Sequence, residues 1–162
     1  MAARQLQDPV CGMMVAEDSY PLEHLHIHYA FCSEQCRERF RRYPHLFVGD
    51  PAHGPSEKQK GRVERKAHRI KLVAAVEGTK RESLRNAVES LMGVETVDVG
   101  GDQVLVVYDL VQVSLNDIED AIIAEIGGIR EGVTDKIRRA FIHYSEECEL
   151  ENLAHLSGHH RH

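Results

Sequence analysis

The stretches "DPVCGMMV" (residues 8–15) and "HYAFCSEQC" (residues 28–36) hold three of the chain's four cysteines. Cys11 stands alone, Cys32 follows after 20 residues, and Cys36 follows after three more. A segment of about 40 residues rarely buries enough apolar surface to fold unaided, so it usually needs a metal ion, disulfides or a partner. The fold of the amino-terminal part therefore depends on what these cysteines do.

The cellular compartment affects whether the cysteines bind metal or form disulfides. The first ten residues, "MAARQLQDPV", lack the apolar stretch of a secretory signal, so we expect a cytoplasmic protein. Thiols stay reduced there, which favours metal binding or redox chemistry over structural disulfides. The chain has neither a Cys-x-x-Cys pair nor a Cys-His-Asn order, so we expect no enzyme activity. A buried cysteine cluster that holds no metal remains an alternative interpretation, because cysteine is often buried.

Spacing favours a shared metal ion. A helix beginning at Ser33 would place Cys32 just before its first turn and Cys36 near the end of that turn. The helix N-terminus would then lower the pKa values of both thiols. Cys11 precedes a glycine, where a tight turn can bring it to the same site. Three thiolates suit Cu(I), whereas Zn²⁺ normally takes a fourth ligand.

The candidates for a fourth ligand are His28, Met13 and a water molecule. His24, His26 and His28 alternate, so in a strand they would share one face. A row of exposed histidines is the simpler interpretation, and Met13 can equally fill a gap in the packing.

These residues resemble a known family. "DPVCGMMV" followed by "YAFCSEQCRERFRRYPHLF" resembles the YHS domain, a relative of the TRASH metal-binding modules, over about residues 8–48. The resemblance implies a small metal-binding domain, which we assign to 6–48, with Cys11, Cys32 and Cys36 as ligands of copper or zinc. It also implies a partner such as a heavy-metal P-type ATPase or another metal-handling protein.

Residues 49–68 combine Gly, Pro and many charges without apolar periodicity, which predicts a linker. Lys and Arg outnumber Asp and Glu by 12 to 9 over residues 1–71, whereas residues 72–162 hold 8 against 17. Basic residues in and beside the linker could contact phosphates, but a solvated face is the simpler interpretation, so we do not expect nucleic-acid binding. This basic set is Lys58, Lys60, Arg62, Arg65, Lys66 and Arg69.

The following segment alternates between strand and helix patterns. The pattern predicts strand, helix, hairpin, helix and a weak last strand, the split βαβ order of a ferredoxin-like βαββαβ domain over 69–133. The whole chain is then α+β. The elements expected are strand 69–76, helix 80–91, strands 94–99 and 103–110, a helix capped by Ser114 that ends at 127–128, and strand 129–133.

Residues 69–133 also resemble the heavy-metal-associated domain of copper chaperones, in "LMGVETVDV" (91–99) and in "VLVVYD" followed by "SLNDIEDAI". That family binds its ion through a Met-x-Cys-x-x-Cys loop, whose positions here fall on Ala75, Glu77 and Lys80. A lysine cation would repel the ion, so this loop should not bind Cu(I). Docking, dimerisation or regulation are the roles that remain for such a domain.

Residues 134–162 are expected to form a helix over 135–148, with Ile137, Phe141 and Tyr144 on or near one face, and then a frayed tail. The tail offers His155, His159, His160 and His162, which could bind a divalent metal weakly. The longest apolar runs, 72–76 and 104–108, are too short to span a membrane.

Together these features predict a soluble protein that binds copper first and zinc second, in metal buffering, delivery or sensing, without catalysis. The alternative is a protein-interaction or regulatory module associated with a metal transport system, held together by structural zinc or by no metal.

Overall fold

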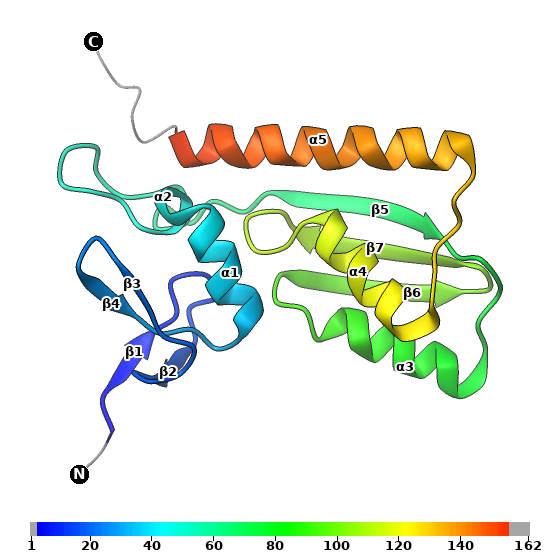
Figure 1. Cartoon of the computed structure of the whole chain (residues 1–162), viewed down its shortest axis with the longest axis horizontal. Coiled ribbons are helices and arrows are strands. Elements are labelled where there is room, and N and C mark those ends of the chain that lie inside the picture. The colour runs from blue at the N-terminus through cyan, green and yellow to red at the C-terminus, as the bar shows by residue number, and fades with distance from the viewer. Residues whose placement is uncertain (1–2, 156–162) are drawn as a thin grey trace. The chain divides into compact units, whose positions relative to one another are not determined.

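The computed structural model describes residues 3–155 and divides into two compact units, each of which is visible in Figure 1. Unit 1 holds residues up to Arg62 together with those from Leu150 on, and unit 2 holds Val63–Glu149. The structure is α+β, with small antiparallel sheets and helices. Within the described residues, no helix is both long and apolar enough to cross a membrane.

Unit 1 begins with two short hairpins. Strands β1 (Gln5–Gln7) and β2 (Met14–Ala16) pair antiparallel, as do β3 (Leu22–His24) and β4 (Ile27–Tyr29). The expectation that three alternating histidines share one strand face is wrong. Leu25 and His26 form the β3–β4 turn with φ of 52° and 64°, so His24 and His28 belong to different strands. A tight turn needs such positive φ values, and here non-glycine residues adopt them.

Helix α1 (Glu34–Arg42) follows and begins where the sequence predicted. Ser33 is its N-cap, and the Ser33 hydroxyl accepts a hydrogen bond from the Cys36 N–H at 3.3 Å. The short helix α2 (Pro44–Phe47) follows α1 in sequence and packs against it. Phe31, Phe40 and Phe47 are at most 1% exposed, with Phe40 5.2 Å from the Phe31 ring and 6.3 Å from the Phe47 ring between centroids. Unit 1 therefore has an apolar core of its own.

Unit 2 is built on one antiparallel sheet with strand order β5-β7-β6. Its strands are β5 (Arg65–Lys71), β6 (Val94–Gly100) and β7 (Gln103–Asp109). Period-2 alternation buries one face of the sheet, where Ile70, Val97 and Val106 lie. Helices α3 (Gly78–Glu89) and α4 (Leu115–Ile126) pack against each other in front of the sheet in Figure 1. The hairpin and both helices lie close to their predicted ranges.

The first strand of unit 2 differs from the prediction of 69–76. Strand β5 begins at Arg65, inside the expected linker, because residues 65–71 pair along their whole length with β7. The apolar run 72–76 leaves the ladder instead. There the Leu72 and Val76 N–H groups donate to the carbonyls of Asp102 and Gly101 at 2.6 and 3.0 Å. Cross-strand pairing thus outweighs local apolarity in setting this strand.

The predicted last strand, 129–133, is reduced to one isolated bridge between Leu72 and Ile129. The Arg130 N–H donates to the Lys71 carbonyl at 2.9 Å, but pairing stops there because helix α5 (Val133–His155) begins three residues later. Gly127 ends α4 with φ of 87°, as the sequence predicted. Helix α5 is longer than the expected 135–148 at both ends.

Candidate metal centre

Three sulfur atoms of unit 1 converge at the start of α1. Cys32 Sγ lies 3.5 Å from Cys11 Sγ and 3.5 Å from Cys36 Sγ. Cys11 arrives through the β1–β2 loop, where Gly12 has φ of 83°, a conformation that favours glycine. All three cysteines are free thiols, and Cys36 is fully buried while the other two are half-buried. The structure therefore brings together the three cysteines singled out from the sequence.

A buried carboxylate, Asp8, joins the thiols. One ligand atom from each of Asp8, Cys11, Cys32 and Cys36 lies within 4.8 Å of the others. Asp8 Oδ1 accepts hydrogen bonds from the Val10 N–H at 2.8 Å and the Cys11 N–H at 3.3 Å. Its Oδ2 accepts one from the Cys32 N–H at 2.8 Å. Asp8 thus ties the loop that carries Cys11 to the residue before α1.

The spacing of the cluster fits a metal ion. Donor atoms held about 2.3 Å from a tetrahedral ion are about 3.8 Å apart. The two sulfur–sulfur distances of 3.5 Å are close to that value. The cluster can therefore close around one small cation with only slight movement of the side chains.

Two of the three thiols, Cys11 and Cys36, are hard to ionise in the absence of a cation. Burial raises the pKa of Cys11 to about 12. The nearby Asp8 charge and the hydrogen bond with Cys32 add to this effect, and a Met13 backbone hydrogen bond opposes it. Burial, followed by the charge of Asp8, also raises the pKa of Cys36. The prediction that the helix N-terminus lowers both thiol pKa values is wrong for Cys36, because burial and a negative neighbour outweigh the helix dipole.

Of the two side chains proposed as a fourth ligand, His28 lies outside the Asp8–thiol group. The ring of exposed His28 points its Nε2 at the Glu17 carbonyl, 2.7 Å away. Met13 is 49% exposed, so it does not fill a gap in the core. Ligation by either residue stays a prediction, and the fourth polar group beside the sulfurs is Asp8.

Sequence reasoning missed Asp8, although a local signal was present. An aspartate two residues before a backbone N–H commonly accepts a hydrogen bond from it, the Asx-turn. The order Asp8-Pro9-Val10-Cys11 has that form, and the structure contains the bond. The signal predicts a turn at this point. It cannot predict the second bond to Cys32, 24 residues away.

In unit 2, the positions aligned with the metal loop of the predicted heavy-metal-associated domain are exposed. Ala75 lies in the loop before α3, Glu77 is its N-cap, and Lys80 is in its first turn. None of them belongs to a group of potential ligands in the described part of the chain.

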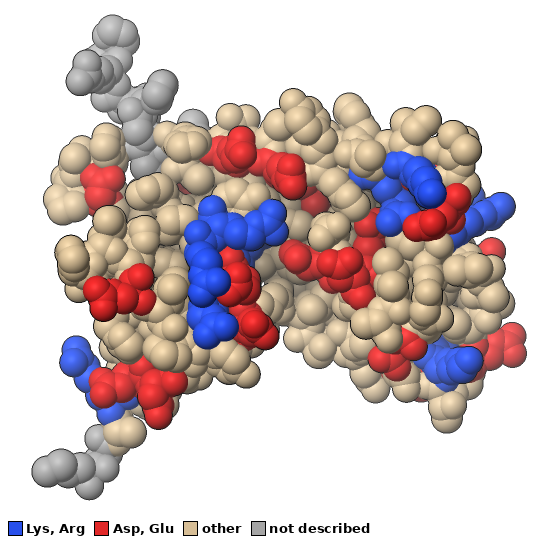
Figure 2. Space-filling view, in the orientation of Figure 1, with Lys and Arg blue, Asp and Glu red and all other residues tan. Residues whose placement is uncertain are grey.

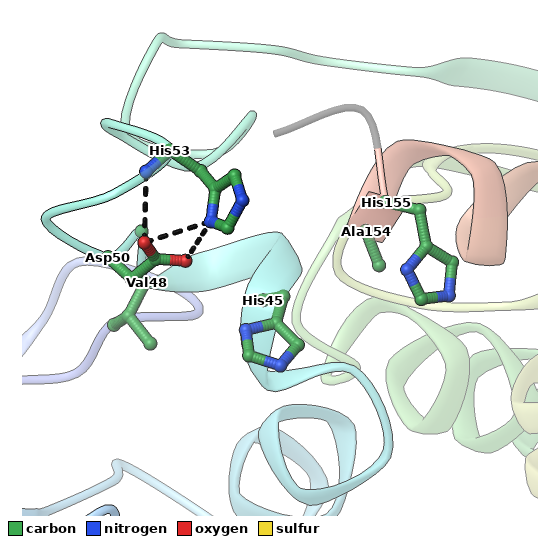
Figure 3. A pocket seen from close by; sticks show the side chains of 7 residues that line it. His45, Val48, Asp50, His53, Ala154 and His155 are labelled. Carbon is green, nitrogen blue, oxygen red and sulfur yellow. Dashed lines mark hydrogen bonds and ion pairs between the residues drawn. The ribbon is translucent and has the colours of Figure 1, made fainter. Parts of the chain in front are cut away.

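Histidines line a separate cavity of about 230 Å³ in unit 1, drawn in Figure 3. His45, His53 and His155 face it, and the Asp50 carboxylate lies 2.8 and 3.0 Å from His53 Nδ1. These hydrogen bonds with His53 lower the pKa of Asp50. Among residues 3–155 only the Asp8–thiol group has its ligand atoms within 4.8 Å, so the imidazoles line this space without forming a compact ligand set.

Of the histidines in the predicted metal-binding tail, only His155 is described. His159, His160 and His162 lie outside the described residues. Metal binding by the tail therefore stays a prediction.

Comparison of the chain with family models, curated proteins and solved structures found no match. The YHS and heavy-metal-associated resemblances therefore stay predictions that rest on the motifs themselves.

Proposed function

We propose that this protein handles a soft heavy-metal ion, copper first and zinc second, through Cys11, Cys32 and Cys36. The observation that carries the proposal is the convergence of the three sulfurs and the Asp8 carboxylate within 4.8 Å. Buried cysteines gathered with a carboxylate repel one another once ionised, and a cation relieves that repulsion. The proposed protein is a binder that buffers, delivers or senses the ion, and it catalyses no reaction.

The donor set favours Cu(I) over Zn²⁺. Asp8 Oδ1 already accepts two backbone hydrogen bonds and Oδ2 accepts one, so little of the carboxylate is left to bind metal. Three sulfurs then form the principal set, and three thiolates suit trigonal Cu(I). Zn²⁺ would need a fourth ligand, from the remaining lone pair of Asp8 Oδ2 or from water.

Delivery requires that a partner can reach the ion. Cys11 and Cys32 are half-buried, so an incoming thiolate can approach them from the surface, while Cys36 stays in the core. Metal would then pass by stepwise ligand exchange to a heavy-metal P-type ATPase or another metal-handling protein. In this proposal unit 1 is a YHS/TRASH-like module, and unit 2 is a ferredoxin-like, heavy-metal-associated domain that has lost its own ligands and serves in docking.

Titration of the reduced full-length protein with Cu(I), in competition with a chromophoric Cu(I) chelator, tests the proposal. We expect one tightly held Cu(I) per chain and an ultraviolet thiolate-to-copper absorption band. Cys32→Ala combined with Cys36→Ala should abolish both signals, whereas Cys148→Ala, which alters the cysteine outside the cluster, should change neither. Unchanged stoichiometry in the double variant would refute the proposal.

The burial of the site favours a second candidate, a structural zinc in a protein-interaction module. Cys36 and Asp8 are both fully buried, as are the ligands of many closed structural sites. Chelation separates the two functions. A structural zinc resists transfer and its removal unfolds the unit, whereas a trafficking site gives up its ion while the fold survives.

A further inference from the structure

Helix α5 has an apolar stripe on the face that it does not bury. Val133, Ile137, Phe141 and Tyr144 are 78, 67, 70 and 67% exposed. They follow one another at intervals of four, four and three residues, which places them along one side of a helix, as in the seam of a coiled coil. Large apolar side chains gathered in this way on a surface usually mark an interaction site.

The opposite side of the helix is already occupied. Within unit 2, Glu146 accepts a hydrogen bond from the Leu115 N–H at 2.8 Å and another from the Tyr108 hydroxyl. Arg139 forms an ion pair with buried Glu119 at 2.9 Å. These contacts fix which side of α5 faces the unit, so the apolar stripe faces away from it.

Charge along α5 is arranged against its own dipole. Lys136, Arg138 and Arg139 lie in the first third of the helix, and no lysine or arginine follows them. The first third of the helix holds one acidic residue, Asp135, and keeps a net positive charge, whereas Glu146, Glu147, Glu149 and Glu151 lie in its C-terminal half. In Figure 2, blue gathers over the N-terminal end of α5 and red over its C-terminal half. Helices are stabilised by the reverse order, and the ion pairs of Arg139 with Glu119 and of Glu149 with Lys66 offset part of that cost within the chain.

We propose that the exposed face of α5 pairs antiparallel with the same face of a second copy of this chain. Antiparallel pairing sets the basic end of each helix beside the acidic end of the other and also opposes the two dipoles. A parallel pair would place like charges together. The contact is isologous, so a two-fold axis closes it as a dimer.

The register follows from the seam. When Phe141 of one copy packs beside Tyr144 of the second copy, Ile137 falls beside Cys148. Arg138 and Glu147 lie on opposite flanks of this seam, so each contributes to the charge of its own end of the helix and they form no direct pair between copies.

The surface area buried between the two copies sets the expected affinity of the dimer. If each of the four side chains buries about 100 Å², two copies bury on the order of 800 Å², which is below the roughly 1,200 Å² of stable interfaces and typical of weak, transient ones. We therefore expect a concentration-dependent dimer with a Kd in the micromolar range.

Sedimentation velocity of the reduced full-length protein, from about 1 to about 500 µM, measures this equilibrium. Wild type should shift from monomer to dimer over this range. Phe141→Glu should stay monomeric with an unchanged circular dichroism spectrum, since the side chain is exposed. Val73→Glu, at a residue 70% exposed elsewhere in unit 2, is the matched control and should dimerise as wild type does. A monomeric wild type, or a dimer unaffected by Phe141→Glu, overturns the proposal.

Disulfide trapping tests the antiparallel direction, because antiparallel pairing places Ile137 beside Cys148 of the second copy, whereas a parallel pair places Cys148 beside Cys148. On mild oxidation, Ile137→Cys should form an intermolecular disulfide between position 137 and Cys148, mapped by proteolysis and mass spectrometry, and Ile137→Cys combined with Cys148→Ala should lack it. Disulfides between like positions only would rule out this pairing. The inference does not rest on the metal site, and Cys32→Ala with Cys36→Ala should leave the dimer intact.

Discussion

Replacement of Asp8 by asparagine should destabilise metal-free unit 1 by about 2–4 kcal/mol. The carboxylate is fully buried and accepts three backbone hydrogen bonds, from Val10 and Cys11 on one oxygen and from Cys32 on the other. The asparagine amide keeps one acceptor oxygen. If that oxygen serves the turn, its NH₂ group faces the Cys32 N–H, so a charge-assisted bond is lost and a buried donor is left unpaired.

Hydrogen–deuterium exchange on reduced, chelator-treated protein measures this loss locally, over peptides that cover residues 8–16 and 28–36. A change of 2–4 kcal/mol corresponds to exchange about 30 to 1,000 times faster, because each 1.4 kcal/mol is a factor of ten. Asp18→Asn, an exposed aspartate of the same unit, is the control and should have almost no effect. Equal exchange in the two variants would refute the anchoring role of Asp8.

The same variant distinguishes anchor from ligand. If Asp8 only positions the thiols, one Cu(I) per chain should still bind to Asp8→Asn. If Asp8 ligates Zn²⁺, Zn²⁺ affinity should fall further, by more than the 10- to 100-fold expected for a positioning residue. Competition titrations with both ions provide that comparison.

Three more outcomes follow from the structure. The pKa of Cys11 is raised from 9.0 to about 12, so its contribution to stability is present below pH 9 and is lost as the pH rises toward 12. The urea midpoint of the metal-free protein should therefore fall across this pH range. It should fall less in Cys11→Ser. Glu146→Gln, which weakens two buried hydrogen bonds, should cost unit 2 about 1.5–3 kcal/mol in urea denaturation, against less than about 0.5 for exposed Glu147→Gln. Gly93→Ala should lower the free energy of unfolding by about 1–3 kcal/mol in thermal denaturation, since φ is +96° and the new Cβ would lie 2.6 Å from a neighbouring side chain. Gly100→Ala meets open space, so it should be tolerated.

Elements defined by local signals were predictable from the sequence. Ser33 and Ser114 mark the starts of α1 and α4 because a cap needs only neighbouring residues. The Ser114 N–H also donates to the Asp117 carboxylate at 3.0 Å, which completes a local capping box. The hairpin of β6 and β7 was likewise defined by alternation around a glycine pair.

Features set by distant partners were not predictable. Strand β5 contains one buried apolar residue, Ile70, and exists because β7 pairs with it. Asp8 joins the cluster through a residue 24 positions away. The direction of the apolar stripe on α5 depends on buried Glu146, whose partners lie 31 and 38 residues away. Periodicity identified the stripe, but only tertiary contacts show that it faces outward.

Unit 1 has more internal support than its length predicts. So short a segment was expected to need occupied cysteines in order to fold. Phe31, Phe40, Leu46 and Phe47 are each at most 1% exposed, and Asp8 closes the cysteine loop with backbone hydrogen bonds that need no ion. Burying four such side chains contributes about 1.5–3 kcal/mol each before the entropic cost of folding is subtracted. On the proposed function, a unit with this internal support would keep its fold after releasing an ion, as delivery requires and as a closed structural site does not allow.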